Sequence, residues 1–130
     1  MARIPVNQPY STAQSIPFGA LDPAAKFKRH AGIDYALPTG REVYAPASGT
    51  VTGYTYGVYH GKVVEIWTGK EYLHMLHNSV LKVSPGDRVT EGQLVALSGS
   101  TGIGVTGPHV HFGVSRVSLP QVTSFADFID

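Results

Sequence analysis

The pair His109 and His111, in Gly107-Pro108-His109-Val110-His111-Phe112, is the clearest sign of chemistry in this sequence. The stretch has the composition of a β-strand, in which alternate residues point to the same face, so both imidazoles can enter one site. His30 and Asp34 lie four residues apart in a segment whose glycine disfavours a helix, and on an extended chain they also share a face. Because the chain has no cysteine, a transition-metal site would use histidine and carboxylate ligands, a set that suits zinc.

The other histidines are less readily placed. His74 and His77 lie in Tyr72-Leu73-His74-Met75-Leu76-His77-Asn78, where they would face opposite sides of a regular strand. At most one of them should therefore enter the site, unless the strand bulges. His60 follows a tyrosine-rich loop and is interpreted as a rim or surface residue. A simpler role, as an exposed or half-buried side chain with a backbone partner, stays open for every histidine here, since a metal or catalytic role needs several groups at one place.

The composition limits the class of protein. A chain of 130 residues is enough for one domain with a real core. Charged residues make up 15% and the formal net charge is +1, which argues against a nucleic-acid partner. No segment approaches the ~20 apolar residues of a membrane span, so we expect no membrane insertion. The first residues lack the apolar region of a secretory signal, which leaves action at the place of synthesis, release by lysis or a dedicated pore, or a mature form.

The pattern of elements predicts an all-β fold, built on an antiparallel sheet or open barrel-sandwich whose long loops form a groove. Short runs rich in Val, Ile, Thr and Tyr, bounded by turn residues, predict these strands: Glu42–Ala45, Thr50–Tyr56, Lys62–Trp67, Glu71–Leu76, Gln93–Gly99 and His109–Arg116. Thr68-Gly69-Lys70 is typical of a hairpin turn. We expect one domain overall. Residues 1–29 would wrap the core as an arm, residues 30–116 would form the core, and residues 117–130 would pack on it as a tail. Within that tail, Thr123–Ile129 is expected to form a short helix capped by Thr123 or Ser124.

Several segments in a fixed order resemble the lysostaphin-type (LytM-like) zinc metallopeptidases, which cleave peptidoglycan. The resemblance covers roughly residues 16 to 116 and rests on four segments: His30-Ala31-Gly32-Ile33-Asp34 with Pro38-Thr39-Gly40; Val43 to Val51; Leu76-His77-Asn78 with Gly86-Asp87-Arg88-Val89; and Ser100-Thr101-Gly102 with Thr106 to Phe112. The rim between Gly102 and Gly107 is one residue longer than the common family form, and position 113 is glycine where many relatives have an acidic residue. These departures concern the groove and the choice of substrate.

The resemblance implies a site and an activity. His30, Asp34 and His111 would bind zinc, and His77 and His109 would be catalytic imidazoles, with His77 preferred to His74. The implied activity is a zinc-dependent endopeptidase that hydrolyses peptide bonds in the stem or cross-bridge of bacterial peptidoglycan. We expect a monomer that acts on the cell wall, in the periplasm or outside the cell. An endolysin encoded by a bacteriophage and released at lysis is one source, and a catalytic domain from a larger secreted enzyme is another.

Three other interpretations compete with this one. A non-catalytic LytM-like regulator of wall hydrolases would share the fold, but such relatives typically lack the zinc ligands. A sugar-transport phosphocarrier has similar β-architecture and uses two close histidines without metal. A lipoyl or biotinyl carrier would need a lysine at an exposed hairpin tip, and Lys70 is a poor candidate because it has no methionine neighbour.

Overall fold

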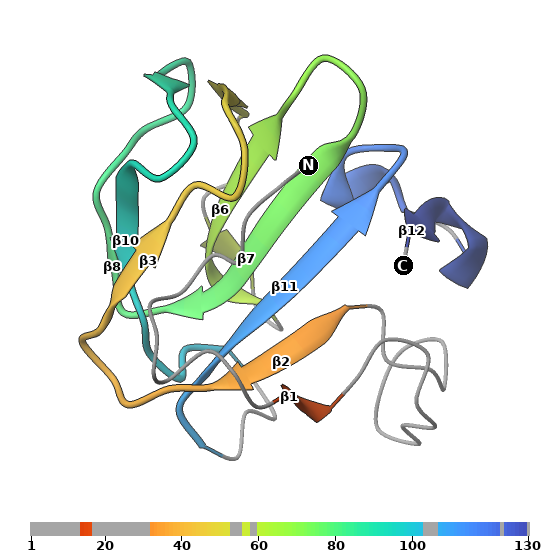
Figure 1. The fold of residues 1–130 in the computed structure, drawn as a ribbon. Coiled ribbons are helices and arrows are strands. Elements are labelled where there is room, and N and C mark those ends of the chain that lie inside the picture. The colour runs from red at the N-terminus through yellow and green to blue at the C-terminus, as the bar shows by residue number, and fades with distance from the viewer. Residues whose placement is uncertain are drawn as a thin grey trace.

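The computed structural model describes residues 32–52, 60–102, 107–122 and 124–129, together with the backbone of Gln14–Ile16 and Tyr56–Gly57. Its larger sheet has nine strands, and seven of them follow one another in the order β1 (Gln14–Ile16), β2 (Ile33–Ala36), β11 (His109–Ser115), β7 (Tyr72–Asn78), β6 (Gly61–Trp67), β4 (Gly49–Val51) and β9 (Arg88–Val89). Figure 1 shows β11 between β2 and β7.

Two further strands extend the larger sheet, and a second sheet packs beside it. The strand β12 (Phe128–Ile129) pairs with β11, and β5 (Tyr56–Gly57) pairs with β6. The smaller sheet has the order β3 (Glu42–Tyr44), β10 (Leu94–Leu97) and β8 (Val80–Leu81). All of these pairings are antiparallel. The all-β prediction is confirmed.

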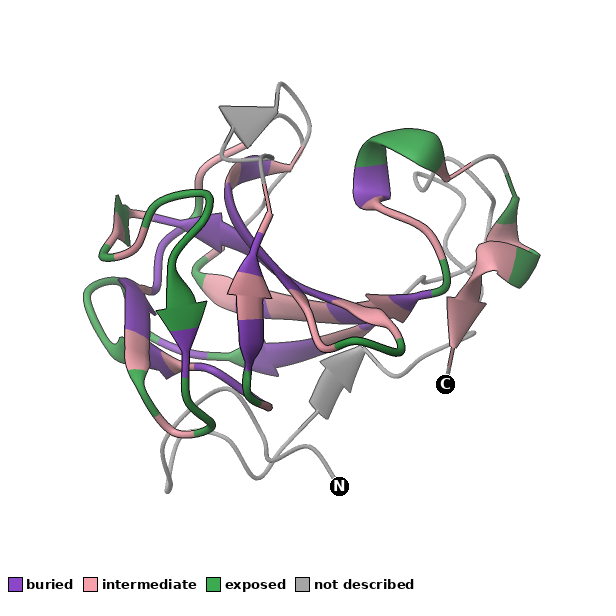
Figure 2. Cartoon of the chain, turned by 90° about the horizontal axis from the view of Figure 1, so that it is seen from above, coloured by how far each residue is buried: buried purple, intermediate pink, exposed green. Residues whose placement is uncertain are grey.

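The main core lies on one face of the larger sheet, between it and the smaller sheet. Its fully buried members come from both sheets and include Val43, Val64, Ile66, Leu73, Met75, Val95 and Val110. Figure 2 shows this buried colouring along the central strands. Burying these apolar side chains contributes roughly 1.5–3 kcal/mol each. The core therefore fixes which face of every central strand is turned inward.

Strand β11 divides its side chains between the two faces. Val110 is fully buried in the main core, and Phe112 and Val114 pack against the same core. The alternate residues His109, His111, Gly113 and Ser115 must then point to the opposite face. Leu76 is the register partner of His111 and therefore points to the same face. There it forms a smaller apolar cluster with Val63 and Leu119.

Most predicted strands are present, with shifted ends. The turn at Thr68-Gly69-Lys70 joins β6 to β7 as expected, with Gly69 at a φ of 95°. The sequence patterns missed the short strands β1, β2, β8, β9 and β12, which have four residues or fewer. Residues 53–55 of the predicted Thr50–Tyr56 strand lie outside the described residues, as does most of the 1–29 arm.

The prediction of a single helix over Thr123–Ile129 is wrong. The tail forms two 3-10 turns, Leu119–Gln121 and Phe125–Asp127, and then the strand β12. Ser124 does cap the second turn, with a capping box to Asp127. The turn is too short to bury an apolar helical stripe, and pairing with β11 stabilises the extended end instead. Among the described residues, no helix has the length and apolar character needed to cross a membrane.

Candidate metal centre

Asp34 and His111 form the centre of the site. They are direct register partners on β2 and β11, and the His111 Nδ1 and Asp34 Oδ1 atoms lie 2.9 Å apart. The Asp34 side chain is 8% exposed and that of His111 is 14% exposed. Antiparallel pairing thus brings together two residues that are 77 positions apart in the chain, because directly opposed residues on neighbouring strands have adjacent side chains.

Gly32 provides the space for the His111 ring. A Cβ atom built on Gly32 would lie 2.6 Å from His111 Nε2 and 2.4 Å from the backbone oxygen of Phe112. The Nε2 side of the ring therefore rests on the backbone at Gly32, and Nδ1 is the nitrogen turned toward the carboxylate of Asp34. No other residue type fits here without moving β2 or β11.

His109 adds an imidazole beside this pair. Its Nδ1 lies 2.8 Å from the carbonyl oxygen of Gly107, and its Nε2 lies 3.6 Å from Asp34 Oδ2. Because a carbonyl oxygen can only accept, Nδ1 must carry the proton. Nδ1 is therefore the donating nitrogen, and Nε2 is the nitrogen that faces Asp34.

His77 also reaches this face, which corrects the expectation that His74 and His77 point to opposite sides. The register between β6 and β7 shifts between Lys62 and Val64, and His77 has a left-handed φ of 72°. This bulge turns the side chain toward the other histidines, with ring centroids 4.9 Å from His109 and 6.2 Å from His111. A left-handed non-glycine residue costs about 1–2 kcal/mol, and such strain is typical of functional sites.

The proton on the His77 ring is also fixed by a backbone partner. His77 Nδ1 lies 2.9 Å from the carbonyl oxygen of Thr101 and so donates to it. Burial, and then the neighbouring His111 and His109, lower the pKa of His77 to about 4. The ring is therefore neutral at pH 7, with its unprotonated Nε2 able to accept a proton.

The described residues supply part of the predicted ligand set. Asp34 and His111 are brought together, whereas His30 lies outside the described residues. Within the described part of the chain, no group of three His, Cys, Asp or Glu side chains is arranged to hold a metal ion. The Asp34 and His111 donor atoms nevertheless suit zinc, since two ligands at 2.0–2.1 Å on a tetrahedral ion lie about 3.3 Å apart. The rim residues 103–106 and the loop with Tyr54, Tyr56 and Tyr59 are also outside the described side chains.

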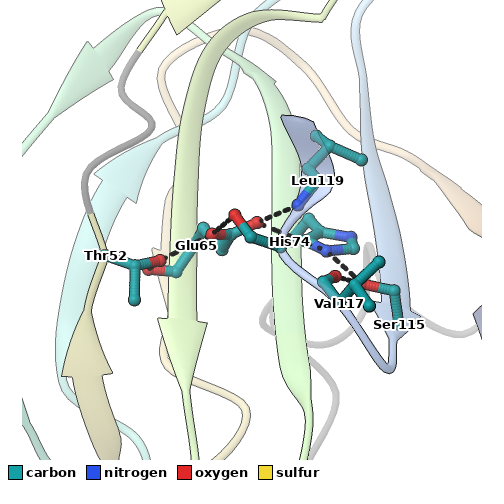
Figure 3. A network of polar contacts seen from close by, with 7 residues as sticks. Thr52, Glu65, His74, Ser115, Val117 and Leu119 are labelled. Carbon is teal, nitrogen blue, oxygen red and sulfur yellow. Dashed lines mark hydrogen bonds and ion pairs between the residues drawn. The ribbon is translucent and has the colours of Figure 1, made fainter. Parts of the chain in front are cut away.

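A second polar cluster lies further along the same face of the sheet (Figure 3). The fully buried carboxylate of Glu65 accepts hydrogen bonds from Thr52 Oγ1 at 2.7 Å, Ser118 Oγ at 2.8 Å and the Leu119 backbone N–H at 2.7 Å. A buried carboxylate is tolerated only when it is hydrogen-bonded in this way. The cluster therefore fastens the start of the C-terminal tail to β6.

The neighbouring His74 and Ser115 do not form a hydrolytic triad with Glu65. Ser115 Oγ donates to the Val117 carbonyl oxygen and accepts from His74 Nε2, 2.9 Å away. Glu65 Oε2 approaches that same nitrogen at 3.6 Å, whereas a triad places the carboxylate on Nδ1. Burial, followed by the charges of His111 and His60, lowers the pKa of His74 to about 3, so the contact with Glu65 is not an ion pair at neutral pH. His74 and Ser115 therefore have a structural role.

Patterns in the sequence did not reveal the roles of four residues at this face, which are Gly32, Thr101, Glu65 and His74. Gly32 was noted only for disfavouring a helix, although it makes room for His111. Thr101 was noted as part of a motif, without its contact to His77. Glu65 and His74 were not connected, although a carboxylate inside an apolar strand, with a histidine on the next strand of the hairpin, is a signal for a buried polar pair.

Comparison with known proteins identifies the family of this chain. Residues 28–122 match the model of peptidase family M23. The chain is 37% identical over 112 residues to the peptidoglycan DD-endopeptidase ShyA of Vibrio cholerae, an alignment that covers 85% of this chain and 26% of that protein. The match spans most of the chain, so the chain belongs to peptidase family M23.

Solved structures support the same conclusion. The catalytic domain of the antimicrobial peptidase lysostaphin from Staphylococcus simulans superimposes with a TM-score of 0.80 at 27% identity, covering 91% of this chain and 87% of that domain. A zinc-containing peptidase from Vibrio cholerae superimposes with a TM-score of 0.75 at 32% identity, covering 87% of this chain and 36% of that one. The chain spans about a quarter of the length of the first curated relatives that it matches.

Replacing Gly32 with alanine should disrupt the candidate metal centre. The new Cβ would lie 2.4 Å from the Phe112 oxygen and 2.6 Å from His111 Nε2, so β2 and β11 must separate. We expect Gly32→Ala to lose bound zinc, measured by elemental analysis after purification with added metal. Gly86→Ala, at a turn with open space around it and a φ of 95°, is the control for the general cost of removing a glycine. Equal zinc content in both variants would contradict the close approach.

Acid should destabilise the protein partly through His74. Its pKa is about 3 when folded and near 6.5 when unfolded, so between these values only the unfolded chain takes up the proton. The contribution is complete above pH 6.5 and is lost progressively as the pH falls toward 3. From pH 7 to about pH 4.5, the free energy of unfolding should fall by about 2 kcal/mol more in the wild type than in His74→Gln. Urea titrations of both proteins after chelation measure this difference, and parallel pH profiles would contradict it.

Proposed function

We propose that this protein is a zinc-dependent endopeptidase that hydrolyses peptide bonds in bacterial peptidoglycan. The observation that carries the proposal is the convergence of two imidazoles, His77 and His109, on the facing pair Asp34 and His111. Three or more such groups at one place are what metal-assisted hydrolysis requires. Membership of peptidase family M23 supports the same reaction class.

His30, Asp34 and His111 are the proposed zinc ligands. Asp34 Oδ1 and His111 Nδ1 already face each other at 2.9 Å, and His30 comes shortly before β2 in the sequence. A bound zinc ion supplies a Lewis acid that polarises a carbonyl and lowers the pKa of a bound water toward ~7. Three protein ligands leave a fourth position open, which is the pattern of catalytic rather than structural zinc sites.

His77 and His109 are the proposed proton-transfer groups. Each donates its Nδ1 proton to a backbone carbonyl, from Thr101 and Gly107 respectively, and so keeps Nε2 available as a base. After accepting a proton, the same nitrogen can pass it to the leaving amine or stabilise the oxyanion through a hydrogen bond. The chain has no glutamate in an H-E-x-x-H motif to perform this task.

The proposed substrate is a peptide stem or cross-bridge of the cell wall. ShyA is described as a peptidoglycan DD-endopeptidase and lysostaphin as an antimicrobial peptidase, and both descriptions fit cleavage of wall peptides. Action on the wall places the enzyme in the periplasm or outside the cell, and we propose that it works there as a monomer. A non-catalytic regulator of the same fold is disfavoured because Asp34, His77, His109 and His111 are all retained.

Two alanine variants should separate metal binding from turnover. His111→Ala removes a proposed ligand, so we expect loss of both zinc and activity. His109→Ala leaves the ligands in place, so we expect full zinc content and a rate at least about 100-fold lower, the contribution typical of a general acid or base. Zinc content by elemental analysis and the rate of muropeptide cleavage measure the two effects. Full metal and full activity in His111→Ala would refute the ligand assignment.

Digestion of purified peptidoglycan tests the reaction itself. The zinc-loaded protein should release fragments with new amino termini, identified by mass spectrometry, because a peptide bond is broken. Removal of zinc with a chelator should abolish the release, and added zinc should restore it. The masses of the fragments identify the bond that is cut. Release that is unaffected by chelation, or no release from several wall types by fully loaded protein, would contradict the proposal.

A further inference from the structure

The backbone around His77 is held by a set of contacts that centre on Thr101. His77 is the one non-glycine residue with a positive φ in the described part of the chain. A left-handed residue persists only where its surroundings over-determine it. The His77 backbone N–H donates to the His60 carbonyl at 3.0 Å. The other contacts come from Thr101, which is 24 residues further along the chain.

Thr101 contacts both the backbone and the side chain of His77. Its carbonyl oxygen accepts the Nδ1 proton at 2.9 Å, and its N–H donates to the His77 carbonyl at 3.3 Å. Its hydroxyl donates to the Asn78 carbonyl at 2.7 Å and accepts from the Lys62 N–H at 3.0 Å. The hydroxyl therefore ties Thr101 to the two strands that form the bulge, and this fixes the position of the carbonyl that faces the ring.

Gly61 and Asn78 accommodate Thr101 at the bulge. At Gly61, which has a φ of 69°, a Cβ atom would lie 2.3 Å from Thr101 Oγ1 and 2.5 Å from its carbonyl oxygen. Asn78 is fully buried, and its Nδ2 donates to the carbonyls of Lys62 and Met75 at 2.9 Å each. These bonds satisfy carbonyl groups next to the shifted register between β6 and β7. The packing leaves Thr101 little freedom to move.

We propose that Thr101 is a positioning residue for His77: its hydroxyl locks the 99–102 segment onto the bulge, so that its carbonyl holds the His77 ring in the Nδ1–H tautomer with Nε2 as the free base. Thr101 acts through His77 and is not itself assigned a contact with substrate. The inference deepens the proposed function and rests on it for the role of Nε2. The tautomer and its cause, however, can be measured without any substrate.

The first test is the tautomer of His77 in the zinc-loaded protein. Nitrogen-15 NMR distinguishes a protonated from an unprotonated ring nitrogen, and the His77 signals are assigned by their loss in His77→Gln. We expect Nδ1–H with unprotonated Nε2 in the wild type and in Thr101→Ser, which keeps the hydroxyl. In Thr101→Val, which has the same shape without the hydroxyl, we expect a mixture of tautomers. A wild-type ring protonated on Nε2 would overturn the proposal.

The second test is the kinetics of the same proteins on a soluble cross-linked muropeptide. Thr101→Val should lower kcat by about 10- to 100-fold, because small misplacements of a catalytic group have effects of this size. Its KM and zinc content should be unchanged, and Thr101→Ser should stay within about twofold of the wild type. Thr90→Val, at an exposed position just after the edge strand β9, controls for a threonine-to-valine change.

The outcomes distinguish the two proposals. The predicted tautomer in a wild type that cleaves no muropeptide would refute the proposed function and leave the role of Thr101 intact. A Thr101→Val variant with wild-type tautomer and kcat would refute the role of Thr101. If Thr101→Val does not fold, the test passes to Thr101→Ser, where loss of the tautomer or of kcat would show that the hydroxyl is not what positions His77.

Discussion

The alternation of side chains along β11 is the constraint on which the site depends. Val110, Phe112 and Val114 pack on the main core, and burial of these apolar side chains fixes the rotation and register of the strand. Once that face is fixed, His109 and His111 can only point the other way. A slip of one residue would move the histidines into the core and Val110 onto the site. The packing of Val110, Phe112 and Val114 in the core and the placement of His109 and His111 at the site thus both follow from the period-two alternation of β11.

The register of β11 against β2 and β7 decides which side chains lie next to His109 and His111. Pairing with β2 sets Asp34 opposite His111, and pairing with β7 sets Leu76 opposite His111 and His74 opposite Gly113. Further along the same face, Glu65 fastens Ser118 and Leu119 at the start of the tail. The tail then covers the end of the face with the cluster of Leu119, Val63 and Leu76. The buried carboxylate is best understood as part of this closure, since burying a charge is costly unless its hydrogen bonds are satisfied.

Two of the imidazoles described at the site share one arrangement. His77 and His109 each give their Nδ1 proton to a backbone carbonyl, and this fixes both the tautomer and the plane of the ring. For His109 the carbonyl is two residues away, at Gly107, so the local turn provides it. For His77 the carbonyl belongs to Thr101, 24 residues away, and the strand must bulge to reach it. The strain at His77 is therefore tied to long-range contacts.

Local sequence patterns were enough to predict the all-β class, most of the longer strands, and a pair of histidines on one face of one strand. These features depend on local patterns: period-two alternation, turn residues and the absence of cysteine. The tertiary structure decided that Asp34 meets His111, that Gly32 makes room for it, and that His77 joins His109 despite its parity. It also turned the expected tail helix into 3-10 turns and a strand. Strand register, a bulge and hydrogen bonds between distant residues set these outcomes, and none of them is encoded in the spacing of residues along the chain.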